Sequence, residues 1–167
     1  SNGKKDDAPA SPVNTLSSGS ISTIETIIIG DTSGSKASAA VNDETMDALI
    51  ASAKTSENSG SKSEISIKVS TDADVANVSL TIPSDSFNKL SSETNASLTI
   101  NSKIGSISFD AKTVENIKSA AGNNDVDISI RKVDTSSLPE ATRQEIGDRP
   151  VYDFSVTADG TEISSFG

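Results

Sequence analysis

Two turns in the chain carry oxygen-donor side chains at alternating spacing, and these are the residues that most resemble a metal site. They are Asp72 and Asp74 in the first turn, and Asn123, Asn124, Asp125 and Asp127 in the second. Calcium prefers hard oxygen ligands of this kind. Neither turn has the glycine and terminal glutamate of an EF-hand loop, and Asp and Asn also form turns by bonding their own backbone. We therefore assign no metal ligand.

Catalytic chemistry is restricted because the 167 residues include no histidine and no cysteine. Imidazole bases, thiol nucleophiles, ordinary zinc sites and disulfides are thereby excluded. A Ser–Lys pair remains compatible with the composition, but serine is too abundant to give it a position. A glycosidase-type carboxylate pair normally lies in a cleft among aromatic sugar platforms. We assign no catalytic residue and no cofactor, and expect that the chain is not an enzyme.

The aromatic residues fit a core better than a sugar platform. Aromatics make up 3% of the chain, and they are Phe87, Phe109, Tyr152, Phe154 and Phe166. The periodicity assigns the first four mainly to core positions. Because hydrophobic residues make up only 33% of the chain, we expect a thin, aliphatic core between layers.

The overall charge limits the partners. A net charge of −10 and a pI near 4.4 disfavour nucleic acids and anionic membranes, which are bound through clustered Lys and Arg. No apolar run approaches the roughly 20 residues that span a bilayer. The sequence therefore predicts neither nucleic-acid binding nor membrane insertion.

Composition divides the chain into two parts. Residues 1–20 have almost no apolar content and are expected to form a disordered tail or linker. Residues 21–167 are expected to form a single α+β repeat domain. Its first element, 21–29, is rich in β-branched residues, which favours a strand, although Ile21, Ile24 and Ile28 would also suit a helical stripe. Residues 31–37 are expected to form a loop.

A strand–helix pattern recurs along this domain. An apolar residue at the end of a strand is followed, five and eight positions later, by two apolar residues of a helix. The sets are Val41, Met46, Leu49; Ile82, Phe87, Leu90; Phe109, Val114, Ile117; and, approximately, Val133, Leu138, Ala141. Units of this kind bury their apolar faces against neighbours. We expect the first nine residues to be buried against one face of a sheet.

Capping and turn residues bound the expected elements. Helices should begin after Asn42 or Asp43, after Ser84 or Asp85, after Asp110, and after residues 134–137, the last helix including Pro139. Alternating strands are expected at 65–69, 78–82, 98–100, 107–109, 126–130, 152–156 and 161–166, with 65–69 and 78–82 forming a hairpin. The predicted fold is α+β with two layers: a curved, mainly antiparallel sheet with three to four short helices on one face, built from repeated strand–helix–strand units.

Three stretches carry a family resemblance. They are Ser79–Ser84, Ala96–Ile100 with Gly105–Asp110, and Gly147–Val156. The chain from about residue 38 to 167 resembles the repetitive modules of large secreted cell-surface proteins of Gram-positive, clostridia-like bacteria, which often carry S-layer homology repeats. Those homology repeats are absent from this chain. The resemblance implies an extracellular, cell-surface location.

The expected function is a non-enzymatic structural or protein-interaction module of a bacterial cell-surface protein. The alternative is a carbohydrate-binding module that uses the polar face of the sheet, although a row of exposed aromatics is missing. In similar proteins the amino-acid sequence after Phe166 continues into further strands. We therefore expect the C-terminal edge to pair with another protein segment or with the continuation of the same chain.

Overall fold

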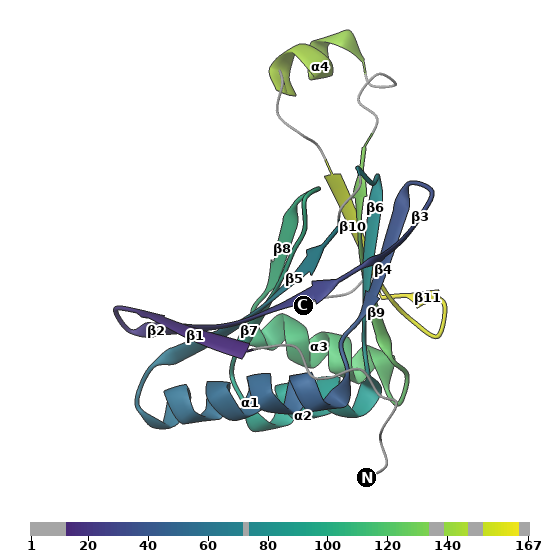
Figure 1. Cartoon of the computed structure of the whole chain (residues 1–167). Helices are drawn as coiled ribbons and strands as arrows, with labels where there is room; N and C mark the ends of the chain where they lie inside the picture. The colour runs from purple at the N-terminus through teal and green to yellow at the C-terminus, as the bar shows by residue number, and fades with distance from the viewer. Residues whose placement is uncertain (1–12, 72–73, 134–138, 147–151, 164–167) are drawn as a thin grey trace.

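The computed structural model describes residues 13–71, 74–133, 139–146 and 152–163. These residues form an α+β fold with two mixed sheets and four helices (Figure 1). The first sheet has the order β1-β2-β5-β7-β8, with bounds Val13–Ser18, Ile21–Ile29, Lys62–Ser70, Ser97–Asn101 and Ser106–Phe109. The second sheet has the order β11-β10-β9-β6-β4-β3, with bounds Thr161–Glu162, Tyr152–Ala158, Val126–Lys132, Asn77–Ile82, Lys36–Ala40 and Asp31–Ser33.

The helices are α1 (Asp43–Asn58), α2 (Ser84–Glu93), α3 (Ala111–Ala121) and α4 (Glu140–Ile146). Helices α1, α2 and α3 lie side by side, with α1 against β2 and β5 and α3 against β7 and β8. Figure 1 shows these three helices together on one side of the first sheet and α4 apart from them. None of the described helices is long and apolar enough to cross a membrane.

Local sequence explains where the helices begin and end. The Asn42 side chain accepts a hydrogen bond from the Thr45 N–H at 2.8 Å and caps α1, and Asp110 caps α3 in the same way. Such caps satisfy N–H groups that have no partner within the helix. At the other end, α1 is followed by Gly60, whose φ of 93° suits glycine. The expected starts of these two helices are confirmed.

The core lies between the two sheets and helices α1–α3. In β6 the aliphatic residues Val78, Leu80 and Ile82 are buried and alternate with polar residues that are partly exposed. The nine residues predicted from the spacing are all buried: Val41, Met46, Leu49, Ile82, Phe87, Leu90, Phe109, Val114 and Ile117. They line a core shared by two sheets, not the face of one. In the fourth, approximate set, Ala141 is exposed, and Leu138 lies outside the described residues.

The expected hairpin of residues 65–69 and 78–82 is wrong. β5 lies in the first sheet between β2 and β7, whereas β6 lies in the second sheet between β4 and β9. Two strands with the same alternation fit either one sheet or two facing sheets, because both arrangements bury one side of each strand. The same ambiguity explains why one mainly antiparallel sheet was expected where two mixed sheets occur.

Further differences concern short polar segments. Residues 13–18 of the expected tail form β1, and residues 31–37, expected to be a loop, contribute to the β3–β4 hairpin. Pairing with β2 and β6 supplies backbone partners that the local composition does not reveal. Helix α2 has Pro83 at its N-cap and no cap from Ser84 or Asp85. α4 begins after Pro139, and the expected start at 134–137 lies outside the described residues.

Two of the four predicted core aromatics are buried, and two are not. Phe87 and Phe109 are buried, whereas Tyr152 is 40% exposed to solvent and Phe154 is 38% exposed. The Phe109 and Phe154 rings meet edge to face with centroids 6.2 Å apart. Both β10 aromatics contact β8 of the other sheet, since the Tyr152 hydroxyl bonds the Ser106 carbonyl and the Phe154 ring meets Phe109.

Replacing Phe87 with alanine should lower the free energy of unfolding by about 3–5 kcal/mol, because it removes a large side chain that is 1% exposed. Chemical denaturation monitored by circular dichroism measures the change. Ser92→Ala, on the exposed side of the same helix, is the matched control and should change stability by less than about 0.5 kcal/mol. A loss below about 1 kcal/mol for Phe87→Ala would contradict the described core.

Candidate functional site

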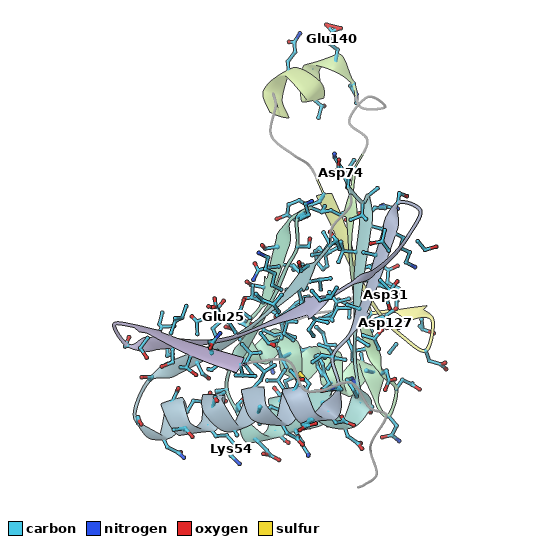
Figure 2. All side chains as sticks on the ribbon, viewed as in Figure 1. Glu25, Asp31, Lys54, Asp74, Asp127 and Glu140 are labelled. Atoms are coloured by element: carbon cyan, nitrogen blue, oxygen red, sulfur yellow. The ribbon has the colours of Figure 1, made fainter. Side chains whose placement is uncertain are left out.

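The outward face of the first sheet carries two hollows, which we call the outer trough. The larger measures about 700 Å³ and includes Ile21, Lys62, Glu64 and Ser97 among its lining residues. The other measures about 490 Å³, with a lining that includes Glu25, Ile27, Ser66, Lys68, Asn101 and Ser106. Glu25 points away from the helices in Figure 2. The smaller hollow is therefore built mainly from the side chains that alternate with the core residues of the strands. The larger hollow lies at the ends of these strands, where the end of α1, the loops before β5 and β7 and the start of α3 complete its lining.

The strand registers bring these side chains together. Thr23 lies opposite Glu64, and Glu64 opposite Ser97. One step along the strands, Ser66 lies opposite Thr99, and Thr99 opposite Ser108. Side chains directly opposite each other on one face of a sheet are close enough to interact. The trough thus has polar rows that run across the strands.

The Glu64 carboxylate joins three strands at the centre of the trough. Its Oε1 accepts a hydrogen bond from the Thr23 hydroxyl at 3.2 Å, and its Oε2 accepts one from the Thr99 hydroxyl at 2.6 Å. Thr99 Oγ1 also lies 2.7 Å from the Ser108 hydroxyl, which extends the chain of bonds to β8. A carboxylate with both oxygens engaged in this way is held in one position.

Asn101 forms a second polar cluster in the smaller hollow. Its Nδ2 donates to the Ser66 hydroxyl at 2.7 Å, and its Oδ1 accepts from the Ser106 hydroxyl at 2.7 Å. Lys68, opposite Asn101 on β5, and Glu25 make no hydrogen bond or ion pair with other described residues. The hollow therefore offers a fixed amide and two hydroxyls beside two charged groups that are available to a ligand.

The larger hollow is bordered by two further carboxylates with structural partners. Glu57, near the end of α1, accepts bonds from the Ser63 hydroxyl and, at 2.9 Å, from the Asn95 N–H. Asp110 accepts from the Thr113 N–H at 2.8 Å. The hydrogen bonds from the Thr113 backbone and then from its side chain lower the pKa of Asp110 below its usual value. These acids connect elements of the fold.

The turns considered for calcium are used structurally where the structure describes them. Asp125 Oδ1 accepts from the Ser84 N–H at 2.9 Å and so supplies the cap that α2 lacks locally, and Asp127 accepts from the Thr81 hydroxyl. Asp74 is exposed, and Asp72 lies outside the described residues. Within the described residues, no group of three or more acidic side chains is placed to hold a metal ion.

Sequence reasoning did not identify the outer trough as a cluster. The alternation in each strand indicates that Thr23, Glu64 and Thr99 face outward, but it does not indicate that β2, β5 and β7 are neighbours in parallel. A single glutamate and two threonines spread over three strands give no motif. Knowledge of the strand order would have been needed to bring them together.

Comparison of the chain with protein-family models, with curated proteins and with solved structures found no match.

Replacing Asp110 with asparagine should reduce the pH dependence of stability. The pKa of Asp110 is lowered in the folded chain from the ordinary carboxyl pKa of 3.8. The ionised Asp110 side chain therefore stabilises the folded state at pH values above 3.8, and this contribution is lost as the pH falls through the lower pKa of the folded state. Asparagine also caps helices but does not titrate. Thermal unfolding at a series of pH values between about 5 and 2 should show a smaller loss for Asp110→Asn than for the wild type. An equal loss of thermal stability with falling pH in the two proteins would contradict the lowered pKa of Asp110.

Proposed function

We propose that the chain is a non-enzymatic structural and protein-interaction module of a bacterial cell-surface protein, located outside the cell. The observation that carries the proposal is a shared register in the two sheets. Ile24 of β2 pairs with Ile65 of β5, and Ala37 of β4 pairs with Val78 of β6, in parallel and 41 positions apart in each case. β2, the short β3, β4 and α1 are followed along the chain by β5, β6 and α2, with β2 and β5 in the first sheet and β4 and β6 in the second.

This register supports two stacked, equivalent units. Met46 and Phe87, the first buried apolar residues of α1 and α2, occupy corresponding positions, as do Leu49 and Leu90. Units that stack on one another can be added in series and give extended proteins. A spacer on a cell surface needs this property, and the family resemblance of the sequence agrees with it.

The chemistry of the described acids also supports a module without catalysis. Glu57, Glu64, Asp110, Asp125 and Asp127 accept hydrogen bonds from protein groups that belong to other strands, loops or helix ends. A general acid or base has to exchange a proton with a substrate. The bonds made by these five carboxylates instead connect elements of the fold.

The proposed partner segment pairs at the C-terminal edge of the second sheet. β11 pairs with the end of β10 through Thr157–Glu162 and Ala158–Thr161, and the Ile163 N–H donates to the Val156 carbonyl at 2.7 Å. In the proposal, the continuation of the parent chain or a segment of another protein adds a strand beyond this hairpin. Main-chain hydrogen bonds would provide most of the affinity.

Extending the chain by the segment that follows residue 167 in its parent protein should raise the melting temperature by about 5 °C or more, because the added strand binds only the folded state. Differential scanning calorimetry measures the shift, and light scattering tests whether the shorter chain associates. The matched control is an extension of equal length with prolines at alternate positions, which removes the N–H donors. An unchanged melting temperature with both extensions, together with a strictly monomeric shorter chain, would contradict a partner at this edge.

The outer trough favours a second candidate, a carbohydrate-binding module. The fixed hydroxyls and amide around Asn101, together with the Glu25 and Lys68 side chains, which bond no other side chain among the described residues, can exchange hydrogen bonds with the hydroxyl groups of a sugar chain. The trough lacks an aromatic platform among its described lining residues. Binding in this case would depend on polar contacts.

If the outer trough binds polysaccharide, Lys68→Ala should weaken retention on insoluble polysaccharides by about tenfold, which corresponds to the loss of one charged hydrogen bond. Co-sedimentation of the protein with the polysaccharides measures retention. Lys36→Ala removes the same charge from an exposed position on the second sheet and should have no effect. Failure of the wild type to sediment, or equal retention of the two variants, would reject this second function.

A further inference from the structure

Strand β1 is an edge strand of the first described sheet, and its own residues lack the usual protection against pairing. It forms one border of the first sheet, next to β2, and has six residues. Its sequence, Val-Asn-Thr-Leu-Ser-Ser, contains no charge and no proline. Natural edge strands are commonly kept from pairing with other chains by charges, proline, bulges or short length.

The other described borders are short or covered. β3 has three residues and includes Asp31, and β11 has two residues and includes Glu162. β8 has four residues, and its Ser106 carbonyl accepts a hydrogen bond from the Tyr152 hydroxyl at 2.9 Å. β1 is therefore the border of the described sheets that is best suited to receive another strand.

The hairpin geometry shows which backbone groups of β1 are available. β1 and β2 are joined by a two-residue turn in which Gly19 has a φ of 64°, and Ser18 lies opposite Ile21. In such a hairpin the residues next to the turn exchange hydrogen bonds, and the pattern then alternates. Asn14, Leu16 and Ser18 therefore bond β2, whereas the backbone groups of Val13, Thr15 and Ser17 point away from the sheet.

An apolar surface adjoins this edge. Leu16 lies opposite Thr23 and so shares the outer face with it. Leu16 is 56% exposed, and Ile21 and Ile27, on the same face of β2, are 46% and 54% exposed. A second strand that covers part of these exposed aliphatic side chains removes apolar surface from water, which favours association at this edge.

We propose that β1 pairs antiparallel with β1 of a second copy of this chain, so that two five-stranded sheets form one continuous sheet. A register centred on Leu16 places Thr15 opposite Ser17 of the second copy. Both residues have backbone groups that point away from their own sheet, so they can bond each other across the interface. The two Leu16 side chains then form a closely spaced pair that makes no backbone bonds of its own. The same patch serves both copies, as a two-fold axis requires.

Charge favours a second copy over another occupant. The chain carries a net charge of −10, so most faces of two copies repel each other. β1 is uncharged, and β2 contributes only Glu25 to the face beside it. An acidic or basic peptide would find no complementary charge on β1 itself, whereas an identical uncharged strand matches it.

Sedimentation velocity over a concentration series of the whole chain tests this proposal. The wild type should form a dimer whose fraction rises with concentration. Thr15→Pro removes an outward N–H without removing a bond to β2, because proline is tolerated where the N–H faces away from the sheet. This variant should remain monomeric, and Thr15→Val, which keeps the N–H, should dimerise like the wild type.

Leu16→Lys is a second variant in case proline disturbs the hairpin. It changes an exposed side chain and sets two like charges against each other, so the dissociation constant should rise about tenfold or more. Circular dichroism and thermal unfolding establish that each variant is folded. A wild type that is monomeric at every concentration, or a dimer that neither variant weakens, overturns the proposal. The second result would instead place the contact elsewhere, as at the C-terminal edge.

Discussion

The structure depends on burying aliphatic side chains from two sheets and three helices in one shared core. Ile65 of the first sheet, Leu80 of the second and Leu49 of α1 are all fully buried, and each such residue contributes about 1.5–3 kcal/mol. With aromatics at 3% of the chain, this core is mostly aliphatic and draws on both sheets. The chain crosses between the sheets, as from β2 to β3 and from β5 to β6. At one crossing, after β2, a Cβ on Gly30 would lie 3.2 Å from Val69, so only glycine fits without displacement.

The same constraint determines the character of the outward faces. On the outward face of the first sheet, serine, threonine, asparagine and glutamate side chains bond one another across the strands. Thr99 is buried although it faces outward, and its hydroxyl contacts Glu64 and Ser108. No buried side-chain nitrogen or oxygen among the described residues lacks a hydrogen-bond partner. A surface ordered in this way loses little conformational entropy when a ligand binds.

Sequence patterns predicted the elements better than their assembly. Alternation and capping residues located β2, β6 and β9 and the starts of α1 and α3, because these signals act within a few residues. They did not predict that β5 and β6 lie in different sheets, that Asp125 caps α2, or that Glu64 meets Thr99. These contacts join residues more than 30 positions apart, and strand order, which local spacing does not encode, decides them. For this reason the outer trough was not found as a cluster before the fold was known.

The borders of the two described sheets differ in how well they are protected from pairing with another strand. β2 pairs in parallel with β5, and β4 with β6, and the described sheets end at β1 and β8 in one case and at β11 and β3 in the other. Short length and Asp31 protect the border at β3, and Tyr152 covers part of the border at β8 by bonding Ser106. The border at β11, where the proposed partner segment would pair, has two residues, one of which is Glu162. The acidic surface keeps the remaining faces apart, since like charges repel at short range. In both proposals association takes place at strand borders through backbone groups, and the polar cluster around Asn101, on β7, lies away from β1 in the strand order of the first sheet.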